Sequence, residues 1–296
     1  MFRFSNQQEQ FEISGVKFGG QPGKRRAVMI GSMFYPRHSV VKDPRTGEVD
    51  KVSVEQKLSA LMDASRETGC PAAVAAYAET PEAMAVYLDM LASLTGLPIL
   101  IDSSDPATRI RGARAAGEMG LQDRVVYNSL GLGSQEEEWK TVQDAGIRSA
   151  VVLAFNPKDV GVKGKIYILD DGDGLVDQGL IEKVGRYGVD RPLIDVAAMA
   201  MEQNAGSALQ ALTVAKAKWG LPVGCALHNT VESWSLLSGT REKDPKLFRY
   251  VDITASVLPM AAGADFVLYG PVEYARTVSY AASFADLMIS QATEGL

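Results

Sequence analysis

The sequence predicts an α/β protein that folds as one (β/α)8 TIM barrel, a single domain over residues 1–296. Three observations support this fold class. A chain of 296 residues fits a single barrel. A content of 46% hydrophobic and 22% charged residues is typical of globular proteins and excludes a disordered scaffold. Finally, one short pattern of residues recurs along most of the chain.

In this pattern a helix-like segment is followed by a glycine and then by a short apolar run. It occurs at Gly69, Gly96, Gly120, Gly146, Gly188, Gly220 and Gly263. Each glycine stands where a helix would end in a left-handed cap. The apolar runs do not alternate with polar residues, which is typical of parallel strands buried on both faces. With an earlier run at 27–31 they make eight strands, and their even alternation with helices favours a closed barrel over an open doubly wound sheet.

Two segments depart from this pattern. Residues 1–26 contain a short hairpin signal around Ser14 and Gly15, and we expect this N-terminal hairpin to close the bottom of the barrel. Residues 156–174 form a long insertion after the fifth strand, with a strand-like stretch at 165–169. Long loops that follow barrel strands lie on the functional face, so the insertion is expected there.

The helices between the strands carry their own signals. Met84, Leu88 and Leu91 share one helical face, and apolar residues at 205–215 share another. Thr80 and Asp105 each precede a proline, which is typical of an N-cap residue followed by the first helical position.

Charge and composition exclude several classes of partner. The chain has 30 basic and 36 acidic residues, a net charge of −6, and no basic block, so we expect no nucleic-acid partner. Its longest purely apolar run, at 72–78, is far shorter than the roughly 20 residues of a membrane helix. Two cysteines are too few for a disulfide scaffold or a thiolate metal cage. These features indicate a cytoplasmic protein without an integral membrane segment.

Polar residues end four of the predicted strands: Asp102, Asn128, Asp195 and, shortly after its strand, Asn229. In a barrel these strand ends meet at one mouth. Because no Arg or Lys stands directly at these ends, we expect the carboxylates to bind a ligand with paired N–H donors. The 2-amino-4-oxo edge of a pterin has such a pair, and an Asn amide can complement the rest of that edge because it both donates and accepts. The alternative is that these short polar residues cap the helices that follow.

Other chemical signals are weak. Gly131 and Gly133 lack the third glycine of a dinucleotide loop. Cys225 and His228 have only Cys70 and His38 to complete a metal site, so core packing and no bound metal are expected.

The strand-end motifs resemble the pterin-binding motifs of corrinoid-dependent methyltransferases. The similarity is greatest to the H subunit of tetrahydromethanopterin S-methyltransferase and its bacterial methylcobalamin:tetrahydrofolate methyltransferase relatives. The motifs are Ile-Asp-Ser at 101–103, Tyr-Asn-Ser at 127–129, Leu-Ile-Asp at 193–195 and Gly-Cys-Ala-Leu-His-Asn at 224–229. Further similar stretches at 18–23, 152–159, 216–224 and 264–271 extend the resemblance over nearly the whole chain.

The resemblance implies a homodimeric barrel that moves a methyl group between cobalt and N5 of a reduced pterin. It implies that Asp102, Asn128 and Asp195 hold the pterin ring and that Asn229, the expected catalytic residue, faces N5. Three further residues are expected next to the site: Asn156, Gly224 and His228. His228 departs from many folate-dependent relatives, which have Ser before this Asn.

The corrinoid itself is expected on a partner. Corrinoid carriers contain the motif Asp-x-His-x-x-Gly. In this chain the residues two positions before the two histidines are Pro36 and Ala226, so neither histidine fits the motif. The methyl group therefore arrives on a corrinoid-binding protein or on free methylcobalamin.

We interpret the chain as a methylcorrinoid:tetrahydrofolate methyltransferase. Two alternatives remain: an enzyme of the H-subunit type that uses tetrahydromethanopterin, and a non-catalytic pterin-binding assembly subunit. A dihydropteroate synthase-like condensation would need an Arg/Lys cluster at the barrel mouth, and no convincing cluster is evident.

Overall fold

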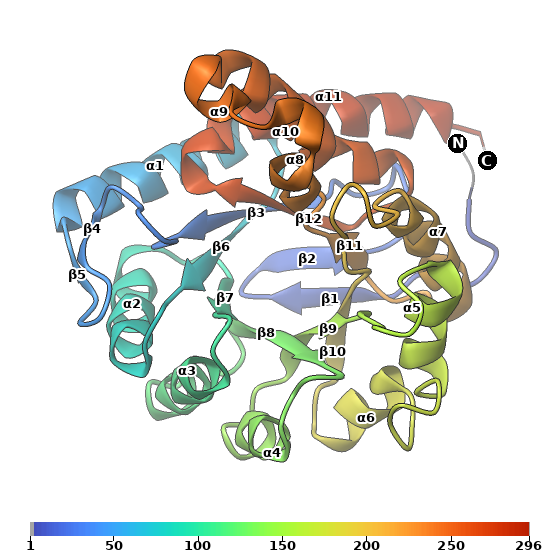
Figure 1. Ribbon diagram of the computed structural model, residues 1–296, viewed down its shortest axis with the longest axis horizontal. Coiled ribbons are helices and arrows are strands. Elements are labelled where there is room, and N and C mark those ends of the chain that lie inside the picture. Colours follow the sequence, from blue (N-terminus) through green and yellow to red (C-terminus); the bar gives the residue numbers. More distant parts are fainter. Residues whose placement is uncertain (1–2, 296) are drawn as a thin grey trace.

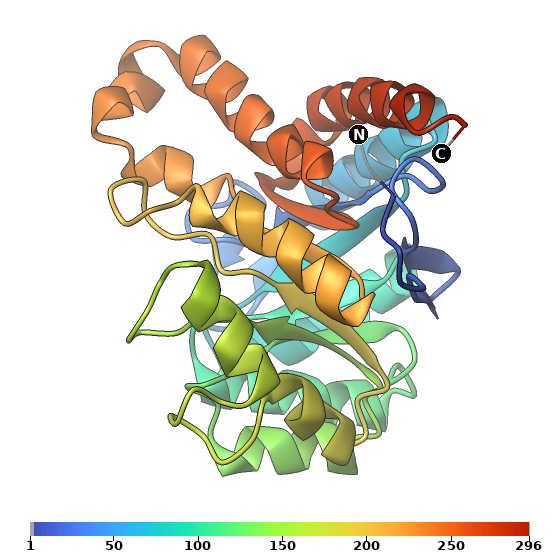
Figure 2. The same cartoon turned by 90° about the vertical axis from the view of Figure 1, so that its right-hand side faces the viewer.

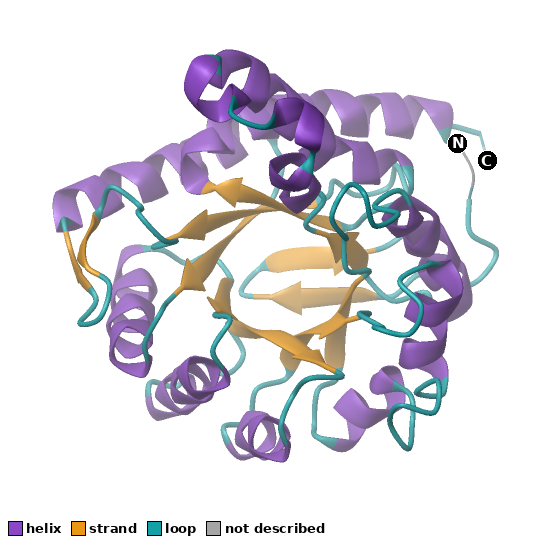
Figure 3. Ribbon diagram, in the orientation of Figure 1, coloured by secondary structure: helices purple, strands orange, loops and turns teal. Residues whose placement is uncertain are grey.

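Eight parallel strands close into a barrel in the computed structural model, which describes residues 3–295. Helices surround the ring of strands (Figures 1 and 3). The strand order around the ring is β10-β11-β12-β3-β6-β7-β8-β9. The predicted (β/α)8 barrel is therefore confirmed.

The barrel strands are β3 (Val28–Met33), β6 (Ala72–Tyr77), β7 (Ile99–Asp102), β8 (Val125–Gly131), β9 (Ser149–Leu153), β10 (Arg191–Asp195), β11 (Val223–Cys225) and β12 (Phe266–Pro271). The helices are α1 (Lys51–Thr68), α2 (Pro81–Leu94), α3 (Pro106–Glu118), α4 (Glu136–Asp144), α5 (Val162–Asp170), α6 (Leu180–Arg186), α7 (Ser207–Trp219), α8 (Asn229–Ser233), α9 (Thr240–Lys243), α10 (Pro245–Ala261) and α11 (Ala275–Ala292), with short 3-10 turns η1 (Ser235–Leu237) and η2 (Val272–Tyr274). A small antiparallel pair, β4 (Val41–Asp43) and β5 (Glu48–Val49), lies between β3 and α1.

The predicted caps are largely confirmed. Gly69 and Gly220 end α1 and α7 in the left-handed conformation, and the side chains of Thr80 and Asp105 accept hydrogen bonds from the first turns of α2 and α3. The prediction is wrong at Gly96, because α2 already ends at Leu94 with an extended C-cap residue.

The N-terminal hairpin closes one end of the barrel. Strands β1 (Gln10–Ile13) and β2 (Val16–Gly19) pair antiparallel and lie across the far opening of the ring in Figure 1. Ile13 and Phe18 are fully buried in the same apolar cluster as the inward-facing side chains of the strands. The hairpin thus seals the N-terminal end of the barrel, as predicted, and leaves the C-terminal mouth as the open end.

The insertion after β9 differs from its prediction. Residues 165–169, expected as a strand, belong to helix α5. The stretch Lys-Ile-Tyr-Ile-Leu has the composition of a strand, but Lys165, Ile168 and Leu169 share one helical face and are buried against the rest of the chain. Tertiary packing therefore overrides local propensity.

A helical excursion follows β11. Helices α8 and α9 project from the end of the barrel opposite the hairpin (Figure 2). Val231 of α8, Leu237 of η1 and Phe248 of α10 form a small separate apolar cluster. The excursion begins at Asn229, so its packing fixes where one predicted site residue lies.

Candidate functional site

Three predicted site residues share the inner face of the barrel mouth. Leu100, Val126 and Leu193 belong to the apolar cluster inside the barrel. Side chains two residues apart on a strand point to the same face, so Asp102, Asn128 and Asp195 also point inward, one layer nearer the mouth.

The register brings these residues into one arc. Asp102 lies directly opposite Asn128 on the neighbouring strands β7 and β8. Asp195 on β10 lies opposite Leu153 of β9 on one side and Gly224 of β11 on the other. Two carboxylates and one amide therefore line about half of the ring, separated by a single apolar strand end.

Asp102 ends β7 in a half-buried position. Burial raises the pKa of its carboxyl to about 6, although the charge of Arg109 and a side-chain hydrogen bond with Asn128 act in the opposite direction. Because this pKa still lies below 7, the carboxyl is mostly ionised at neutral pH and can accept hydrogen bonds.

An ion pair lies behind the Asp102 side of the mouth. Arg109 of α3 donates from Nε at 3.0 Å and from Nη2 at 2.6 Å to Oε1 of the fully buried Glu138 of α4, and from Nη1 to the carbonyl of Ser103 at 2.6 Å. The Tyr127 hydroxyl donates to the same Glu138 oxygen at 2.7 Å. This network ties the loop after β7 to α4, and the charge of Arg109 still lowers the pKa of Asp102.

Asp195 is the more deeply buried carboxylate, with 7% of its surface exposed. Its Oδ1 accepts a hydrogen bond of 2.8 Å from the backbone amide of Ala197. Burial raises its pKa to about 6, while the Ala197 amide and the charge of Lys165 act in the opposite direction.

Lys165 was not predicted as part of the site. It is 1% exposed, and its Nζ donates to the carbonyls of Val196 at 2.8 Å and Ala197 at 2.6 Å. Burial lowers the pKa of the ammonium, and Asp195 counteracts this. The expectation that the mouth carboxylates face no fixed cation is therefore wrong. The two cations, Arg109 and Lys165, come from helices α3 and α5 rather than from strand ends.

Asn229 is exposed at the first position of α8. The N-cap residue is His228, and no side chain caps this helix. The alternative that Asn229 serves as a helix cap therefore has no support. Burial lowers the pKa of His228 to about 4, with the charge of Arg241 acting in the same direction, so the imidazole is neutral at neutral pH.

The two remaining predicted residues have structural contacts. Asn156 is fully buried; its amide donates to the carbonyl of Gly164 at 3.1 Å and to Asp173 at 2.8 Å, and its oxygen accepts from the Lys158 amide at 2.9 Å. It organises the loop before α5 and has no hydrogen-bonding group left for a ligand. At Gly224, a Cβ would lie 2.3 Å from the carbonyl oxygen of Phe266, so the strand leaves no room for a side chain.

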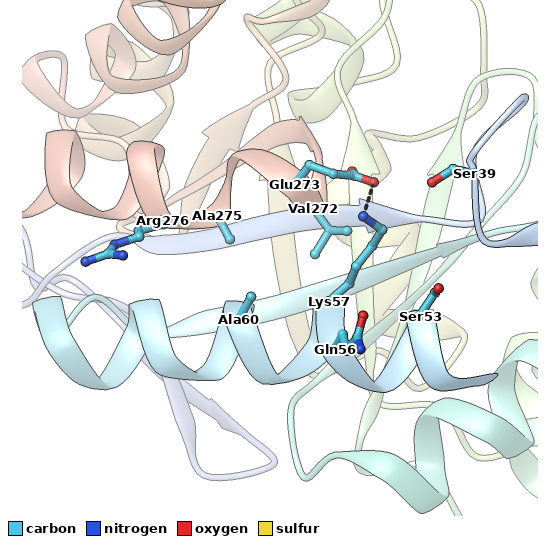
Figure 4. Close-up of a pocket in the computed structure, with 9 residues that line it drawn as sticks. All are labelled: Ser39, Ser53, Gln56, Lys57, Ala60, Val272, Glu273, Ala275 and Arg276. Carbon is cyan, nitrogen blue, oxygen red and sulfur yellow. Dashed lines mark ion pairs between the residues drawn. The ribbon is translucent and has the colours of Figure 1, made fainter. Parts of the chain in front are cut away.

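A cavity of about 300 Å³ lies apart from the predicted residues, between α1 and the η2–α11 segment (Figure 4). Its central contact is an ion pair of 2.9 Å between Lys57 and Glu273. Nε2 of the buried His38 lies 2.8 Å from the same Glu273 oxygen. Burial opposes ionisation of Glu273, but the hydrogen bonds with His38 and Lys57 prevail and hold its pKa at about 2. The charged groups here satisfy one another, which indicates a brace between elements.

Residues 3–295 lack two further features. They contain no cluster of three or more His, Cys, Asp or Glu side chains that could hold a metal ion. No helix among them is both long and apolar enough to cross a membrane.

Comparison with known proteins places this geometry in context. Residues 6–296 match the family model described as the tetrahydromethanopterin S-methyltransferase MtrH subunit. The H subunit of tetrahydromethanopterin S-methyltransferase from Methanothermobacter marburgensis is 38% identical over 296 residues, with 100% of this chain and 96% of the relative covered. The H subunit of the putative methyltransferase mtx from Methanosarcina mazei shows the same identity and coverage.

Solved structures with the same fold share far less sequence. A Yersinia pestis dihydropteroate synthase with a pterine-sulfa conjugate superposes with a TM-score of 0.64 at 12% identity, covering 96% of this chain and 100% of the other. At this identity the likeness supports the barrel fold alone.

Proposed function

The chain belongs to the MtrH family of tetrahydromethanopterin S-methyltransferase subunits, and from this premise we propose that it transfers a methyl group between N5 of a reduced pterin and the cobalt of a corrinoid. The observation that carries the proposal is the arc of inward-facing side chains at the mouth. Asp102, Asn128 and Asp195 lie on the strands β7, β8 and β10 and point into the ring.

Their chemistry matches a pterin. A carboxylate accepts two parallel hydrogen bonds, and the pterin edge presents N3–H and the exocyclic amine side by side. The Ala197 amide occupies only Oδ1 of Asp195, while Oδ2 has no hydrogen-bond partner among residues 3–295. Asn128 complements the pair because its amide can serve both a carbonyl and a donor of the ligand.

The pterin head does not distinguish tetrahydrofolate from tetrahydromethanopterin, because both carry the same 2-amino-4-oxo edge. The sequence alone predicts tetrahydrofolate. The names of the full-length relatives favour tetrahydromethanopterin, and we propose it as the physiological substrate.

The proposed methyl transfer is a displacement at the methyl carbon. The N5 lone pair attacks the methyl carbon on cobalt(III), a C–N bond forms, and the Co–C bond breaks with its electron pair left on cobalt(I). N5 then carries positive charge and loses its proton to water. Asn229 is proposed to accept the N5–H hydrogen bond through its amide oxygen, an interaction that strengthens as charge develops.

The corrinoid is proposed to arrive on a partner protein. The chain lacks the Asp-x-His-x-x-Gly pattern, and several relatives are named as subunits. We further propose that the protein is cytoplasmic and homodimeric.

The test mixes protein, methylcobalamin and a reduced pterin without oxygen and follows the cob(I)alamin spectrum. Tetrahydrofolate and tetrahydromethanopterin are compared in parallel, and calorimetry measures the binding of each. We expect cob(I)alamin only when protein and pterin are both present. Pterin binding without turnover, even with methylated corrinoid proteins, would favour an assembly subunit, and absence of pterin binding would refute the proposal.

A further inference from the structure

A buried ammonium lies behind one of the two site carboxylates. Lys165 belongs to α5, outside the strands, yet it is among the largest fully buried side chains of the described residues. Burying an ammonium is costly unless hydrogen bonds or a counter-charge compensate. Lys165 makes no salt bridge shorter than 4.0 Å within residues 3–295, so its compensation comes from the two carbonyls that it contacts.

Those carbonyls belong to the turn directly after Asp195. Ala197 adopts a left-handed conformation with φ of 53°, which is uncommon for a residue with a side chain. In this turn the carbonyls of Val196 and Ala197 converge on Lys165. The amide of Ala197 points the other way and donates to Oδ1 of Asp195.

A chain of contacts therefore runs from the ammonium through the backbone to the carboxylate. We propose that Lys165 is a positioning residue for pterin recognition: it holds the 195–197 turn so that Asp195 presents its second oxygen to the ligand. The inference rests on the proposed pterin site and adds a residue that acts on the ligand only through Asp195.

The other neighbours of Asp195 do not supply this function. On β9 the facing residue is Leu153, which carries no charge. On β11 the nearby titratable group is the Cys225 thiol, whose pKa is raised well above its usual range by burial, and so it stays neutral. Asp159, in the loop before α5, acts on Lys165 itself. Lys165 is thus the cation that faces Asp195.

The barrel contains a matched control. Lys216 is 0% exposed and likewise donates to a backbone carbonyl, that of Gly20 at 2.9 Å, but it pairs with Asp265 next to the N-terminal hairpin. Replacing Lys216 removes a buried lysine of the same kind away from the mouth.

The experiment compares Lys165→Met, Lys165→Arg and Lys216→Met with the wild-type protein. Calorimetry measures affinity for a reduced pterin as a function of pH, and 13C NMR follows the Asp195 carboxyl, assigned with Asp195→Asn. For Lys165→Met we expect about tenfold weaker pterin binding at pH 7 and an Asp195 pKa raised by about one unit. Lys216→Met should lower the melting temperature and leave both quantities unchanged, and Lys165→Arg should restore part of the affinity.

A folded Lys165→Met protein with wild-type pterin affinity and Asp195 pKa would overturn the inference. If that variant does not fold, the 15N shift of Lys165 Nζ in the wild-type protein decides: we expect it to change as the Asp195 carboxyl titrates, and a shift that does not change would overturn the inference. If the wild-type protein binds no pterin, the proposed function fails, while NMR still decides the link between Lys165 and Asp195.

Discussion

The two carboxylates of the barrel mouth are supported in different ways. Behind Asp102, Arg109 is paired with the buried Glu138, and its charge still lowers the pKa of Asp102. Behind Asp195, Lys165 is bound only to backbone carbonyls, and its charge is not cancelled by an ion pair within the described chain. The cation on the Asp102 side therefore also ties two helices together, whereas the cation on the Asp195 side is held by the backbone turn that follows Asp195. We expect mutations on the two sides to affect different properties.

The largest effect is expected from Glu138→Ala on the Asp102 side. This change leaves Arg109 buried without its partner and removes the acceptor of the Tyr127 hydroxyl. Loss of one member of a buried ion pair costs about 3–5 kcal/mol. Urea denaturation should show a fall of this size in the free energy of unfolding.

The neighbouring Glu137 is the control, because it is 61% exposed and pairs with Arg114 on the surface. Glu137→Ala should change the free energy of unfolding by less than about 1 kcal/mol. Equal losses for the two variants would show that the network behind Asp102 is not a structural tie.

Asn229→Ala tests the part of the mouth that belongs to neither side. If its amide stabilises charge at N5, turnover should fall by about 10²–10³ while pterin affinity changes little. Because no side chain caps α8, the melting temperature should stay at the wild-type value. Single-turnover kinetics and thermal unfolding are measured on one preparation, with Glu232→Ala on the same short helix as control. Normal turnover by the folded fraction of Asn229→Ala would exclude the catalytic role.

Asp195→Ala and Asp102→Ala compare the two sides directly. Loss of a charged hydrogen-bond partner costs about 1.5–3 kcal/mol, or roughly a ten- to hundredfold loss of pterin affinity. We expect the larger loss for Asp195, because it is the more deeply buried carboxylate and a backbone amide fixes its position. Calorimetry measures both, with the exposed Asp123→Ala as control. Unchanged affinity in Asp195→Ala would refute its role in binding.

The sequence was sufficient to predict which strand-borne side chains point into the barrel mouth. Asp102, Asn128 and Asp195 directly end apolar runs, and in a parallel barrel that position alone determines the face on which a residue lies. The N-terminal hairpin could also be predicted from the sequence, because a turn signal in a segment outside the repeat has few other interpretations.

The support behind those side chains could not be predicted. Glu138 follows two other acidic residues in the first turn of α4, and only the packing of α3 against α4 shows that it is buried on Arg109. Lys165 lies in a stretch of strand-like composition that tertiary contacts make helical, and its partners are backbone carbonyls, which leave no mark in the sequence.

The smallest expected effect is a pH dependence shared by both sides. The pKa values of Asp102 and Asp195 are both raised to about 6, mainly by burial, in the free protein. A protonated carboxyl loses one acceptor of the paired hydrogen bond, so pterin affinity should fall as the pH decreases through 6. For each carboxylate that must be ionised, the fall between pH 7 and pH 5 is about tenfold.

The stability of the free protein should respond to the same carboxyls with the opposite sign. A raised folded-state pKa means that the folded protein binds more protons than the unfolded chain between about pH 4 and pH 6, so the contribution of each carboxyl to stability decreases as the pH rises through this window. Wild-type protein should therefore lose stability relative to Asp102→Asn between pH 4 and pH 6, while its pterin affinity increases. Asp102→Asn removes one of the two titrations and should make the affinity profile shallower. An affinity that is constant from pH 5 to pH 7 would show that neither carboxyl titrates in this range in the free protein. Burial would then not raise the pKa of either carboxyl to about 6.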